Sequence, residues 1–381
     1  MTGAVASPIR ALTGRGVSVW LDTLSRELIE DGGLAALLED LAVTGATSNP
    51  TIFAKAICGS DRYDGQLRQA LAAGAGVPGQ LFLDLALEDV RQAAAMLRPL
   101  YDATARADGY VSFECTPDVA DRAAATVAQA LELWRRLDAP NVMIKVPATE
   151  AGIAAVAELT ARGVSVNVTL LFAVERYEQA IEAYLTGLER RARSGQPLAG
   201  IASVASFFVS RVDAKADPGL AHESALRGRL GIANARAAYG RYLERFAGPR
   251  WERLAKLGAA TQRPLWASTA TKDPDHRDVL YLEQLALPGS IITVPETTLR
   301  AFADHGDLRR TEPFDRAAAD ELVRRSSQLS RFARELEREG VDAFAASYEE
   351  LLGCIERRAK ALRGEPEADD RAVHGRARGR S

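Results

Sequence analysis

Short runs of alternating aliphatic and polar residues recur along this chain, and helical patterns rich in Ala and Leu separate them. Such alternation predicts β-strands, while the 3.6-residue spacing of apolar positions predicts helices. The predicted strands are residues 17–22, 43–48, 110–115, 142–146, 165–171, 201–208, 264–269 and 290–294. The helical patterns include residues 24–41, 117–137, 150–162, 174–193 and 274–285. Strands that alternate with helices favour a parallel sheet.

Eight strand–helix units are the number needed to close a single (β/α)8 barrel, the TIM-barrel architecture of the α/β class. We expect this barrel domain to cover residues 1–364. The long connections after strands 2 and 6 are predicted to carry extra helices, around residues 81–105 and 220–246. A doubly wound open sheet is the alternative. It is less favoured because no glycine-rich phosphate loop follows the first strand.

Several predicted strands end with a polar side chain on the face opposite the aliphatic one. The aliphatic face suits a layer of covering helices, so we expect the polar residues to point into the barrel. These residues are Asp22, Glu114, Lys145, Asn167, Thr169 and Ser206. Active sites of such barrels lie at the C-terminal ends of the strands. Convergence of so many polar groups indicates an active site there rather than isolated, hydrogen-bonded core residues.

Lys145 is the most informative of these residues, because it is the single cation in the apolar run 141–147. Burying a lysine is costly unless its charge is paired or lost, and burial lowers the pKa of an amine. An unprotonated amine is a nucleophile toward carbonyl carbon. The alternative is a strand lysine whose ammonium reaches the nearest rim. The polar neighbours favour the nucleophile, and with it Schiff-base chemistry on a ketone or aldehyde.

The other polar residues suit the remaining steps of that chemistry. Asp22 and Glu114 could divide the proton transfers if their environments separate their pKa values. Asn49 and Asn167 could bind substrate hydroxyls, because an amide both donates and accepts hydrogen bonds.

A phosphate site is predicted at the same rim. Ser206 ends the sixth strand, and Arg211 follows about one helical turn later. Arginine binds phosphate bidentately, although an ion-paired surface arginine is the alternative reading of Arg211 alone. Ser268 and Lys272, after the seventh strand, could add a donor and a second charge.

Composition narrows the class of protein. The net charge of −3 and pI near 6.0 argue against a dedicated nucleic-acid binder. The three cysteines and four histidines are scattered, so we expect neither a metal site nor a disulfide framework, and a reducing cytoplasm as the location. There is no signal-peptide pattern or membrane-spanning apolar run. Residues 365–381 are polar and basic, and we expect them to form a disordered tail.

Together, the segments that carry these residues resemble the transaldolase family, in its longer bacterial form. The matching pieces are residues 20–23 (WLDT), 47–52 (TSNPTI), 111–114 (VSFE), 144–149 (IKVPAT), 166–172 (VNVTLLF) and 206–211 (SFFVSR). The resemblance extends from about residue 17 to about residue 351. It implies a (β/α)8 enzyme without cofactor, in the pentose phosphate pathway. Such an enzyme transfers a dihydroxyacetone unit from sedoheptulose 7-phosphate to glyceraldehyde 3-phosphate, giving erythrose 4-phosphate and fructose 6-phosphate.

The resemblance also implies roles by position. Lys145 looks like the Schiff-base lysine, Asp22 like the acid/base for carbon–carbon cleavage, and Glu114 with Thr169 like the pair that orders a catalytic water. Asn49, Asn167 and Ser206 match substrate-contact positions, and Arg211 matches a phosphate-binding arginine.

The sequence departs from the family pattern after the seventh strand, where the segment from Ser268 to Lys272 looks two residues longer. Because of this departure, the family pattern does not by itself assign Lys272 as the second phosphate-binding cation. An aldolase that releases dihydroxyacetone, and an inactive sugar-phosphate-binding barrel, are the competing functions. Retention of Lys145, Asp22 and Glu114 favours the transferase. We expect it to act as a monomer or homodimer.

Overall fold

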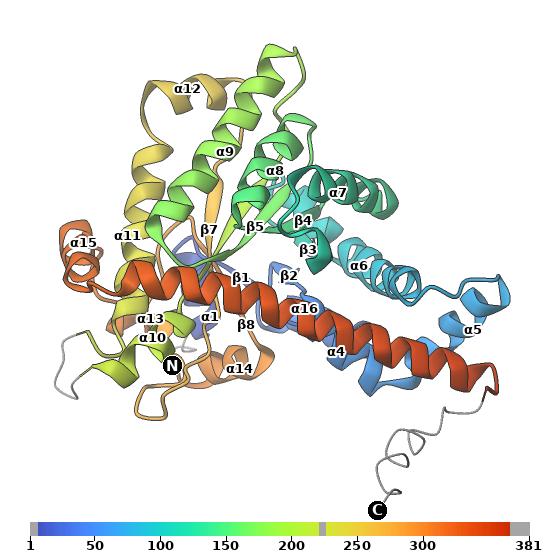
Figure 1. The fold of residues 1–381 in the computed structure, drawn as a ribbon. Coiled ribbons are helices and arrows are strands. Elements are labelled where there is room, and N and C mark those ends of the chain that lie inside the picture. The colour runs from blue at the N-terminus through green and yellow to red at the C-terminus, as the bar shows by residue number, and fades with distance from the viewer. Residues whose placement is uncertain (1–6, 221–225, 366–381) are drawn as a thin grey trace, which may run out of the picture.

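The computed structural model describes residues 7–220 and 226–365, and its centre is a closed parallel barrel (Figure 1). Its strands are β1 (Ser18–Leu21), β2 (Gly45–Thr47), β3 (Tyr110–Glu114), β4 (Val142–Pro147), β5 (Val166–Leu171), β6 (Ser203–Phe208), β7 (Gln262–Ala267) and β8 (Ile291–Val294). Each strand pairs with the next one along the chain, and β1 pairs with β8 to close the barrel. The predicted (β/α)8 fold is therefore confirmed.

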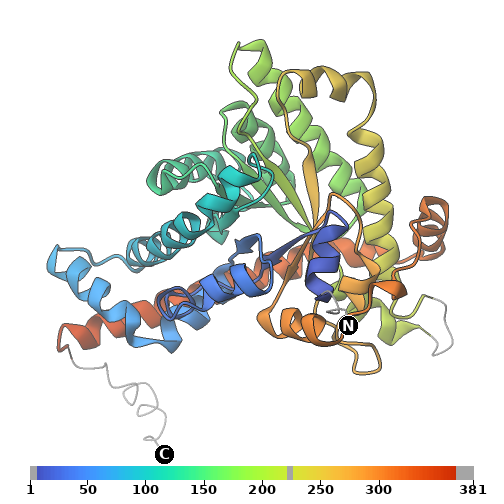
Figure 2. The ribbon, with the colours of Figure 1, turned by 180° about the vertical axis from the view of Figure 1, so that it is seen from behind.

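Helices surround the barrel and fill its two long connections (Figures 1 and 2). They are α1 (Pro8–Gly14), α2 (Arg26–Glu30), α3 (Gly33–Asp40), α4 (Pro50–Gly59), α5 (Asp64–Ala72), α6 (Pro78–Ala103), α7 (Ala123–Leu137), α8 (Glu150–Ala161), α9 (Val174–Arg193), α10 (Ser210–Ala216), α11 (Leu230–Arg245), α12 (Gly248–Lys256), α13 (Leu280–Gln284), α14 (Glu296–His305), α15 (Arg316–Arg325) and α16 (Leu329–Leu362). The extra helices predicted after strands 2 and 6 correspond to α6 and α11, and the same connections also carry α4, α5, α10 and α12.

The strands alternate between two hydrophobic clusters, as their sequence pattern predicts. On β4, Val142 and Ile144 pack in the larger cluster with the surrounding helices, whereas Met143 packs in the smaller cluster with Trp20. Leu170 is an exception. Alternation with the inward-facing Asn167 and Thr169 would place it against the helices, but the pairing of β5 with β6 shifts register between Val168 and Leu171, and Leu170 has φ +60°. This bulge turns Leu170 into the smaller cluster.

Three predicted helices are shorter than their sequence patterns, and the one predicted over 117–137 begins only at Ala123, as α7. The pattern over 24–41 is divided into α2 and α3 because Gly32 adopts φ +76° between them. The pattern over 274–285 yields only α13, because its first residues form turns. Apolar spacing alone does not reveal where a glycine or a turn interrupts a helix.

The long helix α16 returns across the mouth of the barrel to lie beside α4 and α6 (Figures 1 and 2). Gly340 permits the close approach to β5, since a Cβ there would lie 2.8 Å from Leu170 Cδ2. Four residues later Phe344 lies over the strand ends, with its ring centroid 5.8 Å from Lys145 Nζ. The mouth of the barrel is therefore partly covered by a helix from the far end of the sequence.

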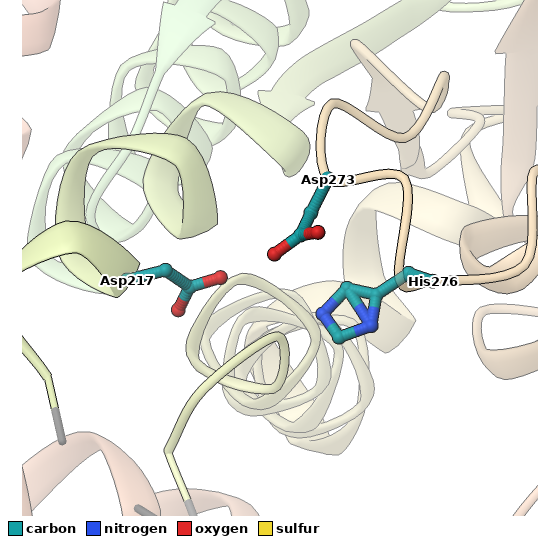
Figure 3. A group of neighbouring side chains, drawn as sticks. All are labelled: Asp217, Asp273 and His276. Atoms are coloured by element: carbon teal, nitrogen blue, oxygen red, sulfur yellow. The ribbon is translucent and has the colours of Figure 1, made fainter. Parts of the chain in front are cut away.

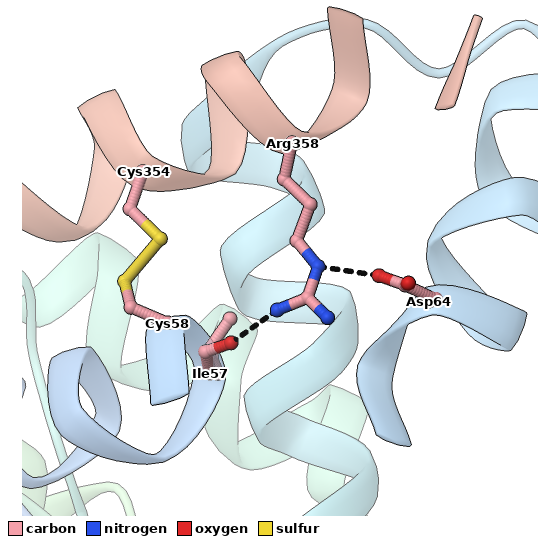
Figure 4. The surroundings of a disulfide bond; sticks show 5 residues. All are labelled: Ile57, Cys58, Asp64, Cys354 and Arg358. Carbon is pink, nitrogen blue, oxygen red and sulfur yellow. Dashed lines mark hydrogen bonds and ion pairs between the residues drawn. A yellow bond between two sulfur atoms is a disulfide. The ribbon is translucent and has the colours of Figure 1, made fainter. Parts of the chain in front are cut away.

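The expectation that the cysteines form no disulfide is wrong. Cys58 at the end of α4 and Cys354 in α16 are joined by a disulfide, with their Cα atoms 6.1 Å apart (Figure 4). They are separated by 296 residues in sequence, and only the return of α16 brings them together. Cys115 is a free, buried cysteine.

Apart from Glu365, the predicted tail lies outside the described residues. Within the described parts of the chain, every helix is too short or too polar to cross a membrane.

Candidate active site

A cavity of about 350 Å³ opens at the C-terminal ends of the strands. Eight of the ten predicted site residues line it: Asp22, Asn49, Lys145, Thr169, Ser206, Arg211, Ser268 and Lys272. Glu114 and Asn167 are not among its lining residues and contact the lining residues from beneath. The site is thus assembled from strand ends and the segments that follow them.

Lys145 is buried on β4, with 4% of its surface exposed. Its Nζ lies 3.4 Å from Glu114 Oε2 and donates a hydrogen bond to the Ser48 carbonyl at 3.1 Å. The register of the sheet explains the pairing, because Glu114 on β3 and Asn167 on β5 flank Lys145 directly. Its amine is therefore held at the floor of the cavity beside a carboxylate.

Glu114 is 6% exposed, and this burial raises its pKa to about 7. The neighbouring Lys145 opposes the rise, while the charge of Asp22 adds to it. Glu114 Oε2 and Thr169 Oγ1 are both buried, and neither has a hydrogen-bond partner among the described residues. A carboxyl group that titrates near neutrality can both take and give a proton.

Asp22 follows β1 and is less buried than Glu114. Its backbone N–H donates to the Val294 carbonyl at 2.8 Å, and the Thr47 hydroxyl donates to Asp22 Oδ1 at 2.8 Å. Thr47 Oγ1 is also 3.3 Å from the hydroxyl of Thr293. These contacts orient the carboxylate at the cavity wall.

The two predicted amide contacts differ in the structure. Asn167 is fully buried: its Nδ2 donates to the Ser112 hydroxyl at 3.0 Å, and its Oδ1 accepts from Ser206 at 2.7 Å. Asn49 accepts the Ile52 N–H at 3.0 Å as the N-cap of α4, and its side chain lines the cavity. The amide of Asn167 is thus hydrogen-bonded to other side chains of the protein, whereas the amide of Asn49 faces the cavity.

Arg211 and Lys272 give part of the cavity rim a positive charge. Arg211 is partly buried, its guanidinium carbon lies 5.2 Å from the Phe208 ring centroid, and burial lowers the pKa of the group. Within the described chain Arg211 has no hydrogen-bond or ion-pair partner. Ser268 has φ +56° and shares a 2.8 Å hydrogen bond with Ser210, while Lys272 is exposed. This rim can bind an anion.

Sequence reasoning missed several residues that line the cavity, among them Thr47, Lys55, Thr293 and Phe344. Thr47 begins the family-like segment 47–52 and ends β2, and this position could have identified it as a site residue. Lys55 projects from α4, six residues or about 1.7 turns after Asn49. Phe344 gave no signal, because only the path of α16 brings it to the cavity.

Asp217, Asp273 and His276 form a second polar group at the barrel rim (Figure 3). Their candidate ligand atoms lie within 4.8 Å of one another, and His276 Nε2 is buried without a hydrogen-bond partner. However, Arg227 pairs with Asp273 at 3.0 Å, and the Gly228 N–H donates to both oxygens of Asp217. With a guanidinium already at this position, we interpret the group as a charge cluster that joins two loops.

Comparison with known proteins agrees with the geometry. Residues 19–355 match the family model described as transaldolase/fructose-6-phosphate aldolase. The chain is 48% identical to a transaldolase of Saccharopolyspora erythraea, covering 92% of this chain and 97% of that protein. It is 46% identical to a transaldolase of Thermobifida fusca (92% and 98% covered) and 47% identical to transaldolase 1 of Streptomyces coelicolor (92% and 95% covered).

Proposed function

This chain belongs to the transaldolase family, and on that premise we propose that Lys145 carries the substrate as a Schiff base. The enzyme is a transaldolase of the pentose phosphate pathway. It transfers a dihydroxyacetone unit from sedoheptulose 7-phosphate to glyceraldehyde 3-phosphate, giving erythrose 4-phosphate and fructose 6-phosphate. One observation carries the assignment of Lys145: its buried amine lies 3.4 Å from a carboxyl group whose pKa is about 7, at the floor of the cavity.

Imine formation needs the neighbouring carboxyl group. The Lys145 amine adds to the ketone carbon, the carbonyl oxygen becomes a hydroxyl, and this hydroxyl leaves as water once it is protonated. We assign the proton transfers to Glu114, acting through a water held between Glu114 Oε2 and Thr169 Oγ1. Both oxygen atoms are buried without a hydrogen-bond partner among the described residues, and Glu114 Oε2 lies 3.4 Å from the reacting amine of Lys145, which supports this assignment.

Cleavage of the carbon–carbon bond needs a base on the other side of the substrate. Asp22 removes the proton from the hydroxyl two carbons from the iminium carbon, and that C–O becomes the departing aldehyde. The bonding electrons move to the iminium and leave an enamine on Lys145. The enamine then attacks the acceptor aldehyde, Asp22 returns the proton, and water releases the ketose. The hydrogen bond from Thr47 supports this role by fixing the Asp22 carboxylate.

Substrate recognition is assigned to the remaining lining residues. Asn49 and Ser206 bind hydroxyl groups, and Asn167 acts beneath them by orienting Ser206. Arg211 binds the phosphate, with Ser268 and Lys272 contributing a donor and a charge at the same rim. The unpaired guanidinium of Arg211 supports the phosphate assignment.

The iminium itself accepts the electrons of the breaking bond, so we propose that the reaction needs no metal or cofactor. We further propose that the enzyme acts in the cytoplasm as a monomer or homodimer, with the barrel as one catalytic domain. The chain's membership of a metabolic sugar-phosphate family supports these assignments.

Borohydride reduction in the presence of fructose 6-phosphate tests the assignment of Lys145. Reduction converts the covalent intermediate into a stable amine, so peptide mass mapping should find a three-carbon adduct on the peptide that contains Lys145. The Lys145→Ala variant should give no adduct. An adduct on Lys55 or Lys272, which also line the cavity, would overturn the assignment.

A further inference from the structure

Helices α4 and α16 lie side by side and run in the same direction, away from the cavity. The Thr51 and Ser347 hydroxyls are 2.8 Å apart near the cavity end, and Cys58 is bonded to Cys354 toward the other end. Both pairs are 296 residues apart in sequence, so the two helices stay in register over the seven residues between the contacts. Seven residues are about two helical turns, which is the repeat of a parallel coiled-coil seam.

Both helices beside this seam also bury apolar residues in the main core of the protein. Phe53 and Ile57 of α4 and Leu351 and Ile355 of α16 are buried in the same cluster. Arg358 adds polar contacts at the far end, donating to the Ile57 carbonyl at 2.7 Å and pairing with Asp64 (Figure 4). The disulfide is therefore one of several contacts that hold the helices together.

Each helix of the pair contributes to the active-site cavity. Asn49, Thr51, Ile52 and Lys55 at the start of α4 line it, and so does Phe344 of α16, whose ring lies above Lys145. The position of α16 against α4 thus determines the shape of one side of the cavity. It also determines where Phe344 lies over the Lys145 amine. A change at the far end of the seam can reach the cavity through two rigid helices.

The disulfide can be reached by a thiol. Cys58 is exposed and Cys354 is half-buried, whereas Cys115 is 3% exposed and burial raises the pKa of its thiol. Exchange requires attack by a thiolate on an accessible sulfur. In an enzyme of a reducing compartment, a disulfide is usually redox-sensing rather than permanent.

We propose that Cys58 and Cys354 form a reversible oxidation site that fastens the covering helix α16 and thereby sets the affinity of the enzyme for its sugar phosphates. The consequence for affinity rests on the proposed function of the cavity. A dithiol reductant supplies two electrons: one of its thiolates attacks the disulfide, and its second thiol resolves the mixed disulfide. The products are the oxidised, cyclic reductant and two cysteine thiols on the enzyme.

Reduction should loosen the helix pair without unfolding it, because the Thr51–Ser347 hydrogen bond, the Arg358 contacts and the burial of apolar residues of both helices in the core remain. The reacting groups Lys145 and Glu114 lie on strands and should keep their positions. The expected effect is therefore on KM, with kcat unchanged.

The test compares oxidised and dithiothreitol-reduced enzyme of full length. Thiols are counted after denaturation without reductant, and KM and kcat are measured with fructose 6-phosphate and an acceptor aldehyde. We expect one thiol in the oxidised and three in the reduced enzyme, from a total of three cysteines. Reduction should raise KM by about fivefold, the lower part of the usual range for coupling between two sites, and an oxidised low-molecular-weight disulfide should reverse the rise.

Two variants make the test specific. Cys58→Ser/Cys354→Ser should show the high KM under all conditions and ignore dithiothreitol. The matched control, Cys115→Ala, should keep the full response. Three thiols in enzyme treated with the oxidant, or an equal KM in both states, would overturn the proposal. Borohydride trapping at Lys145 is read separately in each redox state, so a failure of the Schiff-base assignment cannot be mistaken for a failure of the redox site.

Discussion

At the scale of single residues, the site depends on two carboxyl groups in different surroundings. Glu114 is buried beside Lys145, and its pKa is raised to about 7 mainly by loss of hydration. Asp22 is more exposed and accepts a hydrogen bond from Thr47. The two carboxyl groups therefore lie in different environments, which suits them to different steps of the reaction.

Substituting each carboxyl group separately should show this division. Asp22→Ala should still form a Schiff base with fructose 6-phosphate but stall before cleavage, so the trapped adduct retains all the substrate's carbons. Glu114→Gln should instead slow formation of any adduct, by about 10²–10⁴-fold. Mass spectrometry of the borohydride-reduced enzyme distinguishes the two outcomes. A three-carbon adduct formed at the normal rate in Asp22→Ala would assign the base to another residue.

The alternation of aliphatic and polar residues along each predicted strand identified most of the candidate site residues. Asp22, Lys145 and Thr169 could be placed because each ends a strand on the inward face, where a barrel gathers its polar groups. Phe344 could not be placed in this way, because helical periodicity identifies a buried face but not the surface that covers it. Asn167 illustrates a second case. The sequence predicted its place on a strand, but it could not predict the hydrogen bonds of its amide with Ser112 and Ser206.

At the scale of elements, buried polar contacts hold the segments that carry the cationic rim. Arg211 lies in α10, and two residues later Asp213 accepts hydrogen bonds from the Gly231 N–H at 2.7 Å and the Tyr281 hydroxyl at 2.9 Å. Gly231 permits this approach, since a Cβ there would lie 2.8 Å from Asp213 Oδ2. One carboxyl group therefore joins α10, α11 and α13, a connection that the sequence pattern does not reveal.

This carboxyl group should make stability depend on pH. Burial raises the pKa of Asp213 from 3.8 to about 7, with nearby Asp217 adding to the rise. Between these values the folded state binds a proton that the unfolded state releases, so this group's stabilising contribution falls as pH rises. The slope is at most about 1.4 kcal/mol per pH unit.

Asp213→Asn removes this titration and keeps the shape of the side chain. Wild-type enzyme should therefore lose stability relative to Asp213→Asn as the pH rises from 5 to 7. Urea unfolding at several pH values measures the difference. A free-energy difference that stays constant across this range would show that Asp213 is ionised throughout.

At the scale of the whole molecule, the pattern of strands and helices fixes the barrel but not the path of its last helix. Eight alternating units leave few closed arrangements, because parallel strands joined through helices have a fixed handedness. By contrast, α16 follows the last strand, so no further strand constrains where it packs. Its course decides the pairing of Cys58 with Cys354, and this explains why the cysteine spacing suggested no disulfide.

The disulfide should also contribute to global stability, independently of any effect on KM. It links residues 296 apart, so it restricts the unfolded chain over most of its length. A cross-link over so long a separation is expected to stabilise by about 4 kcal/mol, at the upper end of the usual range. Guanidinium unfolding of oxidised enzyme and of Cys58→Ser/Cys354→Ser should show this loss in the variant. The variant should also unfold with a steeper denaturant dependence, because its unfolded chain exposes more surface. Equal midpoints and slopes, with the thiol count confirming the bond in the oxidised enzyme, would mean that the noncovalent contacts alone fix α16 against α4.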